Sequence, residues 1–359
     1  MTGSPSVAVV VPAFGFEPLL GRVAGAILAS SDVTVELAIV DNGFECPDLA
    51  EWADDPRITW LRPGHNTGFT GGCNLGAAAT TAPVIAFVNS DAVVAPNALR
   101  RLVDALSIPG TGLVTGCVVL DATPDIVNAA GNPVHYSMLS WAGGWGDPVA
   151  RHRAPTTPAS ISGALFAVER SWWTELGGFH EALFAYGEDV ELSVRSALAG
   201  LSVRYVPEAV ARHHYEFHRN PGKFYLLERN RLINLATLYE PATLVALAPG
   251  LLAIELGILV ASIRGSWWRE KLRGYRWLAE HRTEIRARRR QVQAHRQVPD
   301  AAVVGRLELA LTPSEQSGAT VPPVVNRVIA ALGRQGIRRI VRRSRRLRGG
   351  QSHETSRIH

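Results

Sequence analysis

The segment FVNSDAVV, residues 87–94, places polar groups directly after a run that is apolar enough to be a buried strand. Asp91 is a carboxylate of the kind that Mg²⁺ or Mn²⁺ binds together with water and substrate phosphates, and Asn89 adds a hydrogen-bonding amide. A single Asp after a strand is also a common turn residue. The segment therefore predicts a hard-cation site only if other parts of the chain supply further ligands.

An acidic pair in GEDVELSVR, residues 187–195, is the first such group. Glu188 and Asp189 open a helix with periodic apolar positions, where carboxylates cap free N–H groups and favour the helix dipole. One carboxylate is enough for a cap. A second one, held beside a cleft, accepts a proton from a substrate hydroxyl, so the pair predicts a general base.

Histidines in RHHYEFHRN, residues 212–220, are the second group. His213, His214 and His218 are dense enough to suggest a metal ligand, although a solvated cluster is the alternative. No cysteine lies nearby, so a zinc finger is excluded. A mixed set of His and Asp fits Mn²⁺ or Mg²⁺ instead.

The elements that must position these groups alternate between strand and helix over the first 120 residues. Apolar runs at 7–13, 35–42, 57–63 and 82–89 predict strands. Runs of this kind separated by helices are typical of a parallel sheet covered on both faces, which binds ligands beyond the carboxyl ends of its strands. We expect the residues at those ends to converge on one crevice. They are Pro12, Ala13, Asp41, Asn42, Asn66, Asn89, Ser90 and Asp91.

The C-terminal third has a different composition. Residues 241–263 are about as long as a membrane span, but they include Glu255 and an internal Pro-Gly, which favours helices lying in the membrane interface over a true span. We expect residues 1–240 to form the first domain, 241–311 to form apolar and basic interfacial helices, 312–323 a linker, and 324–359 a basic amphipathic helix and tail. The apolar positions of that helix are Val325, Val328, Ile329, Leu332, Ile340 and Val341.

Several common chemistries are excluded. No GxxxxGK[ST] motif exists, and GFTGGCNLG at 68–76 neither matches GxGxxG nor follows the first strand, so a P-loop and a dinucleotide-binding Rossmann domain are both disfavoured. It still offers backbone N–H groups at a helix start, although a tight turn with close helix packing is the alternative. The three scattered cysteines form no CxxC pair, which is typical of a reducing compartment. The N-terminus lacks a basic region, so 7–13 is a strand and not a signal peptide.

The motifs occur in a recognisable order. PAF, VDNG, NTGFTGGCNLG, FVNSD, SGALFAVER, GGFHEALFAYGEDVELSVR, VPEAVARHHYEFHRN and YLLERNR, spread over about residues 7–235, resemble the family 2 glycosyltransferases of GT-A fold. The rhamnosyltransferase-like branch, which builds bacterial cell-envelope glycans, is the most similar. The expected fold is therefore α/β, with a Rossmann-like, mostly parallel sheet covered by helices on both faces.

The resemblance implies an inverting transfer of a sugar, with rhamnose as one candidate. The donor would be a dTDP-, UDP- or GDP-linked sugar and the acceptor a glycan or a polyprenyl-diphosphate-linked glycan. It also implies Mn²⁺ or Mg²⁺ as cofactor, no nucleic-acid partner, and a cytoplasmic enzyme peripheral to the inner face of the membrane.

Family roles carry over position by position. Asp189 would be the catalytic base with Glu188 beside it, and Asp91 and His213 would bind the metal, with His214 as the alternate ligand. The donor pocket would comprise Pro12, Ala13, Asp41, Asn42, Asn66, Gly68, Phe69, Asn74, Asn89, Ser90 and Gly163. The acceptor side would comprise Trp172, Trp173, Tyr186 and Arg229.

The sequence also departs from the family pattern. Asn89 stands where the DxD motif has its first acid, which leaves Asp91 as the sole carboxylate there. His180 replaces the Asp of GGFDE, and Glu216 and His218 stand where many members have Gly and Ser. Because Asn89 weakens the metal motif, the chain could instead be a non-catalytic binding homologue.

Two different classes of protein share some of these features. A nucleotidyltransferase should carry a Gly-rich loop with Arg or Lys after its first strand, and PAFGFEPLL has no basic residue. The net charge of +5 is unevenly spread, and a nucleic-acid-binding protein would use the Arg-rich tail at 338–348. Its interleaved Ile, Val and Leu fit a membrane face better than an RNA-binding arm, whose aromatic residues would stack on bases.

Overall fold

The computed structural model describes residues 3–46, 52, 54–214, 222–312 and 321–355. It comprises two compact units. The first unit is Met1–Pro133, Trp141–Ala197 and Leu201–Pro221, and the second is Val134–Ser140, Leu198–Gly200 and Gly222–His359. The sequence assigns 223–240 to the first domain, whereas these residues belong to the second unit here. Glu216, His218 and most of the predicted linker, 313–320, lie outside the described residues.

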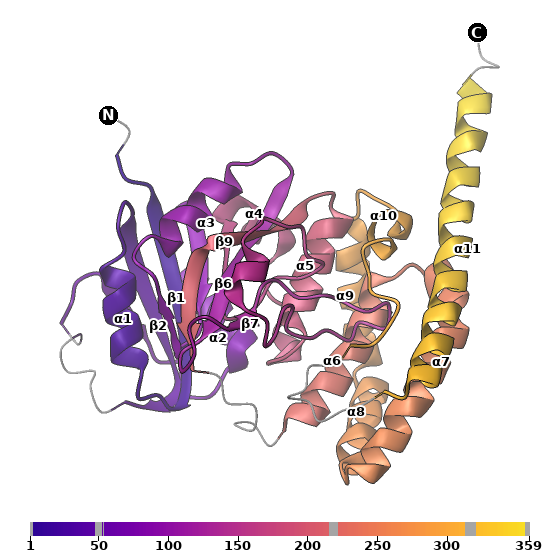
Figure 1. The fold of residues 1–359 in the computed structure, drawn as a ribbon, viewed down its shortest axis with the longest axis horizontal. Helices are drawn as coiled ribbons and strands as arrows, with labels where there is room; N and C mark the ends of the chain where they lie inside the picture. Colours follow the sequence, from indigo (N-terminus) through magenta and orange to yellow (C-terminus); the bar gives the residue numbers. More distant parts are fainter. Residues whose placement is uncertain (1–2, 47–51, 53, 215–221, 313–320, 356–359) are drawn as a thin grey trace. The chain divides into compact units, whose positions relative to one another are not determined.

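The first half of the sheet in the first unit is parallel, as predicted (Figure 1). Strand β1 (Ser6–Phe16) lies between β2 (Thr34–Glu45) and β4 (Val84–Val88), and β2 also pairs with β3 (Ile58–Leu61). Helices α1 (Leu20–Leu28) and α2 (Gly68–Ala78) connect these strands. The strands have near-continuous Val, Ile and Ala because both faces of this sheet are covered.

The second half of the sheet is mixed, so the expectation of a mostly parallel sheet is only half right. In the described residues the order is β3-β2-β1-β4-β8-β6-β9-β5, with β7 (Val127–Ala129) also on β6. Strand β8 (Leu165–Glu169) is antiparallel to both β4 and β6 (Thr111–Leu120). Strand β9 (Ser202–His213) is parallel to β6 and antiparallel to β5 (Ala92–Val94). Apolar periodicity does not encode such long-range pairings.

Two apolar layers cover the sheet. Val7, Val9 and Val11 of β1 point to one face, where they pack with α1 and with α3 (Ala98–Leu106). Val10 points to the other face and packs with α2, α4 (Arg170–Leu176) and α5 (Glu188–Leu198). This alternation is the period-2 geometry of a strand. The two layers leave the carboxyl ends of β1, β2 and β4 to carry the polar residues.

The second unit is helical. It contains α6 (Lys223–Leu238), α7 (Pro241–Arg264), α8 (Trp268–Glu280), α9 (Arg282–Ala294), α10 (Asp300–Val304) and α11 (Pro323–Thr355). Helix α6 packs on α8 and α9, and α7 packs on α11. The ring of Tyr136 lies against Gly250 of α7 and Gly333 of α11, and its hydroxyl donates to the Ile329 carbonyl at 3.0 Å. Small residues therefore let α7 and α11 approach around one buried tyrosine.

The amphipathic pattern of α11 predicts an apolar side that is free to bind a membrane. In the structure this side is only partly free. Ile329 and Ile340 are buried within the second unit, Leu332 and Val341 are half-buried, and α11 packs on α7. Val324, Val325 and Val328, in its first two turns, remain exposed. Among the described helices, α7 is the one that is long and apolar enough to cross a membrane.

Candidate active site

Sheet pairing brings Asp91 and His213 together, although they are far apart in the sequence. Ala92 of β5 lies opposite His213 of β9, so Asp91 directly precedes the pairing position. Its Oδ1 lies 3.0 Å from Nε2 of His213. The His213 side chain is buried and that of Asp91 is 16% exposed, which leaves the carboxylate at the edge of the core. A carboxylate and an imidazole at this distance are donor types that suit Mn²⁺.

The orientation of the His213 ring is set by a residue that sequence reasoning missed. Asn128 of β7 is buried, and its Oδ1 lies 3.0 Å from Nδ1 of His213. Since an amide oxygen only accepts, Nδ1 donates to Asn128, and Nε2 is the ring nitrogen that faces Asp91. The Asn89 amide nitrogen also lies 3.4 Å from that Nε2. Nothing in the local sequence marks Asn128, because β6 alone brings β7 and β9 together.

His214, the alternate ligand, is placed differently. Its side chain is exposed, and its backbone N–H donates to the Asp91 carbonyl at 3.0 Å. It thereby fixes the backbone of Asp91, while His213 faces the carboxylate. No group of three or more His, Cys, Asp or Glu residues suited to a metal occurs in the described ranges. The residues present therefore fit a cation that takes two protein ligands and completes its shell with water and phosphate oxygens.

Glu188 and Asp189 lie at the first turn of α5, as predicted. Oδ1 of Asp189 accepts the Val190 N–H at 2.8 Å, which is the expected capping role, and Oδ2 accepts from the Asn132 amide at 3.2 Å. Glu188 is 8% exposed, and its Oε2 has no hydrogen-bond partner among the described residues. Burial raises the pKa of both carboxyls, and the neighbouring charge of Asp189 raises the pKa of Glu188 further. The Asp189 carboxyl is therefore held in place by hydrogen bonds, whereas burial of the Glu188 carboxyl lowers the stability of the folded state.

The loop before the acidic pair is held by the start of α2. Gly68 has φ +72°, and a Cβ there would collide with the Phe184 carbonyl, so only glycine fits. The backbone N–H of Thr70 donates to that same carbonyl at 3.1 Å. Phe184 and Tyr186 have φ of 65° and 68°, which is uncommon for bulky side chains. Backbone strain of this kind is typical of functional loops, and here α2 stabilises it.

Three residues predicted for the donor pocket support this loop. Oδ1 of Asn42 accepts from the backbone N–H and the hydroxyl of Thr67 at 3.0 and 2.8 Å, and its amide donates to the Gly68 carbonyl at 3.0 Å. Asn66 accepts from the Gly68 N–H at 2.8 Å. Asn74 bonds both the N–H and the carbonyl of Phe179. These amides position the α2 start, so their observed contacts are with protein backbone.

The carboxyl ends of β1 and β2 hold other residues that the sequence predicts for the donor pocket. Asp41 lies opposite Ala13, and its Oδ1 accepts from the Gly43 N–H at 2.9 Å. Pro12 and Ala13 are largely covered, whereas Phe14, which sequence reasoning missed, is 57% exposed. An exposed phenylalanine beside an aspartate at the carboxyl end of a strand is an available surface for a flat ring. Its hydrophobic side chain in PAFGF was the only signal.

The segment 163–164 connects the Asp91–His213 pair with the Glu188–Asp189 pair. The Asn89 N–H donates to the Ala164 carbonyl at 3.2 Å, next to Ser90 and Asp91. A Cβ on the preceding Gly163 would lie 4.0 Å from Oε1 of Glu188 and 3.8 Å from the Phe69 ring. Residues 163–164 therefore touch the metal-ligand side through Asn89 and the acidic pair through Glu188. Phe69 and Gly163 therefore lie close to each other, and their place in a donor pocket stays a prediction.

The predicted acceptor side is not supported as a group. Trp173 is 7% exposed and packs on Phe87 and Phe179, so its predicted contact with an acceptor is wrong: the ring belongs to the core. Trp172 packs against the same core cluster and donates to Ser196 at 3.2 Å. Their adjacency in the sequence gave no indication of burial. Two bulky aromatics on a short helix read equally well as a binding surface.

The other two acceptor-side residues lie in separate units. Tyr186 belongs to the strained loop that leads into Glu188, where its side chain is half-buried. Arg229 belongs to α6 of the second unit, where it donates to Asn230 at 2.9 Å and stacks on Trp277, with the guanidinium carbon 4.7 Å from the ring centroid. Both of these contacts lie within its own helical unit.

The buried acid gives a stability prediction. Because burial raises the folded-state pKa of Glu188, the unfolded chain loses its proton first, so stability falls as pH rises from about 4.5 toward the folded pKa. We expect Glu188→Gln to raise Tm relative to wild type by roughly 2–4 °C at about pH 8, with almost no gain at about pH 5. Thermal melts at both pH values check this. An equal difference at both would mean that Glu188 titrates normally.

Proteins of similar sequence are found among known proteins. Similar sequences include the O-antigen biosynthesis protein RfbC of Myxococcus xanthus, which is 28% identical over 227 residues, covering 59% of this chain and 17% of RfbC. The succinoglycan biosynthesis protein ExoO of Rhizobium meliloti (strain 1021) is 30% identical over 171 residues, covering 47% of this chain and 45% of ExoO. The matches thus span less than half the length of these relatives.

Structural similarity shows the fold. The crystal structure of GalNAc-T7 with UDP, GalNAc and Mn²⁺ aligns with a TM-score of 0.54 and 21% identity, covering 65% of this chain and 48% of that one. The first unit therefore has a GT-A-like α/β fold with a mixed sheet. Residues 5–234 match the family described as Glycosyltransferase like family 2. Because this match covers more than half of the chain, the protein belongs to glycosyltransferase-like family 2.

Proposed function

We propose that this protein transfers a sugar, with inversion at the anomeric carbon, from a nucleoside-diphosphate sugar to a hydroxyl of a cell-envelope glycan or a lipid-linked precursor. One observation carries the proposal: the Ala164 carbonyl accepts from the Asn89 N–H beside Asp91, and a Cβ on the adjacent Gly163 would lie 4.0 Å from Oε1 of Glu188 beside Asp189. Such a transfer requires a pair of residues that binds a cation and a carboxylate that acts as general base. Asp91 with His213 and Asp189 with Glu188 would supply them on the two sides of this short segment. The family match supports neither a nucleotidyltransferase nor a nucleic-acid-binding protein.

Asp189 is proposed as the general base. Its Oδ2 is aimed by the Asn132 amide, whose own Oδ1 is 3.4 Å from the Gly143 N–H and whose backbone bonds Ser160 in both directions. Inversion needs one base that removes the acceptor proton during attack, so the retaining arrangement of two close carboxyls is unnecessary. Burial raises the pKa of Asp189, which makes the carboxylate a stronger proton acceptor.

Asp91 and His213 are proposed as the protein ligands of Mn²⁺ or Mg²⁺, which the resemblance implies and the donor set fits. The Asn128 contact leaves Nε2 of His213 as the ligand atom. When bound, the cation supplies positive charge next to the departing diphosphate. Asn89 replaces a second carboxylate, so the protein contributes one negative charge. The remaining coordination would come from phosphate oxygens and water.

The end of β1 and β2 is proposed to hold the nucleotide. Asp41 would accept a hydrogen bond from the base, and the exposed ring of Phe14 would stack on it. Asn42, Asn66 and Gly68 would shape the pocket wall through the start of α2, and their contacts allow this without direct ligand bonds.

The finer assignments rest on the resemblance alone. Rhamnose as donor sugar, dTDP, UDP or GDP as carrier, a polyprenyl-diphosphate-linked acceptor, and a place at the cytoplasmic face of the membrane are proposed on that basis. The printed names of RfbC and ExoO, two bacterial polysaccharide biosynthesis proteins, support the general class of product.

A ligand-binding screen tests the proposal. UDP-, dTDP- and GDP-sugars are added with Mn²⁺ to the full chain, and Tm is followed. A bound donor at about 100 times its Kd stabilises the folded state by about 2.7 kcal/mol, so the correct donor raises Tm by several degrees. In Asp91→Asn the Mn²⁺-dependent part of that rise should disappear. If no nucleoside-diphosphate sugar shifts the melt of the wild-type protein, the proposed donor class is wrong.

A further inference from the structure

The exposed side of α7 is uniformly apolar. Every exposed residue from 241 to 263 lacks a polar side chain. The large ones recur three, four or seven residues apart, which places them on one side of the helix. They are Val245 (75% exposed), Leu252 (64%), Leu256 (64%), Val260 (48%) and Ile263 (59%). This α7 stripe extends for about 27 Å along the helix axis, from Val245 to Ile263.

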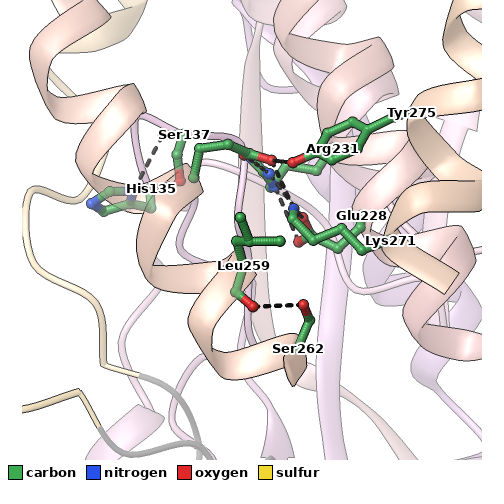
Figure 2. Close-up of polar contacts among 9 residues, drawn as sticks. His135, Ser137, Glu228, Arg231, Leu259, Ser262, Lys271 and Tyr275 are labelled. Atoms are coloured by element: carbon green, nitrogen blue, oxygen red, sulfur yellow. Dashed lines mark hydrogen bonds and ion pairs between the residues drawn. The ribbon is translucent and has the colours of Figure 1, made fainter. Parts of the chain in front are cut away.

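Glu255, the acidic residue of α7, points away from the stripe. Glu255 accepts hydrogen bonds from Arg231 of α6 and from Lys271 and Tyr275 of α8, and Lys271 and Arg231 also bond Glu228 at 2.8 Å. Figure 2 shows Arg231, Lys271 and Tyr275 converging on this cluster. Burial alone would raise the pKa of Glu255, but the two cations outweigh it and lower that pKa to about 2.

This ion-pair cluster decides how α7 meets its surroundings. Lys271 and Arg231 are 1% and 3% exposed, and the two cations balance the two carboxylates. Moving α7 away from α6 and α8 to cross a bilayer would take Glu255 from both of its cations and leave Arg231 and Lys271 with Glu228 alone, at a high cost in hydrocarbon. The helix is therefore fixed to its unit on one side and apolar on the other.

The end of the stripe carries the residues that favour a lipid headgroup region. Immediately after Ile263, the turn into α8 exposes Arg264 and Arg269, with Trp268 between them at 41% exposed. Leu272, one turn further along α8, is 49% exposed. Tryptophan and arginine are common where protein crosses from hydrocarbon to anionic headgroups. A second protein surface would not require this order of apolar stripe, tryptophan and cations.

We propose that α7 and the α7–α8 turn form a monotopic membrane-binding face, in which the α7 stripe lies in the outer hydrocarbon of a bilayer and Arg264 and Arg269 contact anionic headgroups. The helix lies along the membrane surface and does not cross it, because the Glu255 cluster holds it to α6 and α8. This face would bring the enzyme to a lipid-linked acceptor, and in that respect it rests on the proposed function. Its evidence comes from the second unit alone.

The test uses the full chain and vesicles without donor or acceptor, so it is independent of sugar transfer. We expect the wild-type protein to float with vesicles that contain phosphatidylglycerol and to bind pure phosphatidylcholine more weakly. Leu252→Glu with Leu256→Glu should weaken binding at least about tenfold. Arg264→Gln with Arg269→Gln should weaken binding to the anionic vesicles by about thirtyfold. Ile108→Glu, at an exposed apolar position of the first unit, is the matched control and should bind as wild type does.

Three results would overturn the proposal. Unchanged flotation of the folded Leu252→Glu, Leu256→Glu protein, checked by circular dichroism, would place the membrane contact elsewhere. A wild-type dimer that this variant converts to a monomer, without vesicle binding, would show that a second copy covers the stripe. Wild-type protein that resists alkaline carbonate extraction would show that α7 crosses the bilayer.

Discussion

Asp189→Asn removes sugar transfer almost completely, with kcat lowered by about 10³–10⁴-fold while donor binding survives. The amide cannot accept the proton of the acceptor hydroxyl, but it keeps the size of the carboxylate. Its single oxygen can still accept from the Val190 N–H, so the start of α5 remains in place, although the Asn132 amide loses its acceptor. Transfer assays give kcat, and the donor-induced rise in Tm shows that the donor site is intact.

Asn132→Ala separates positioning from proton transfer. It removes the contact with Oδ2 of Asp189 but leaves the base present, so we expect a smaller fall in kcat of about 10–100-fold and a changed pH profile. The pKa of Asp189 should rise, since the Asn132 hydrogen bond lowers it. Asp104→Asn, at an exposed ion pair on α3, is the control carboxylate and should be fully active. Full transfer by Asp189→Asn would exclude Asp189 as the base and direct attention to Glu188.

We expect chelation with EDTA to stop turnover and added Mn²⁺ or Mg²⁺ to restore it. The reason is that the proposed ligands, Asp91 and His213, would hold a cation whose positive charge stabilises the diphosphate leaving group. His213→Ala should raise the metal concentration required for half-maximal activity by more than about 100-fold, because a ligand is lost. Metal titrations of each variant measure this.

Asn128 and His214 provide the graded controls. Asn128→Ala leaves His213 in place but frees its ring, so we expect metal affinity to fall by about 10–100-fold. His214→Ala should behave as wild type, since its contact with Asp91 is made by the backbone. If His214→Ala has the larger effect, the ligand assignment is reversed. Activity unchanged by EDTA would make the transfer metal-independent.

Local sequence was sufficient for the elements and for the chemical residues. Continuous Val and Ile runs predicted β1, β2 and β4, and the acidic pair at a helix start predicted Glu188 and Asp189 at the first turn of α5. These features depend on residues close in sequence, such as the alternation of Val7, Val9 and Val10 between two faces. The same local signals could not distinguish a core residue from a binding residue, so Trp173 was wrongly placed on the acceptor side.

The surface of the C-terminal helices shows the same limit. Periodicity correctly predicted that α11 has an apolar side, but Ile329 and Ile340 on that side are buried in the unit, and the large exposed stripe belongs to α7. A helix with apolar residues on both sides gives no sequence signal for which side faces outward. The partners of Glu255 decide it, because an ionised group turns toward its counter-charges.

The sequence by itself determined the strands β1, β2 and β4 and the position of the acidic pair at the start of α5, because period and residue type are local properties. Only the tertiary structure decided that β8 enters the sheet antiparallel, that β5 pairs with β9, and that Asn128 and Asn132 orient His213 and Asp189. Those contacts join segments 57 or more residues apart, and they form because the whole sheet must bury both of its faces at once.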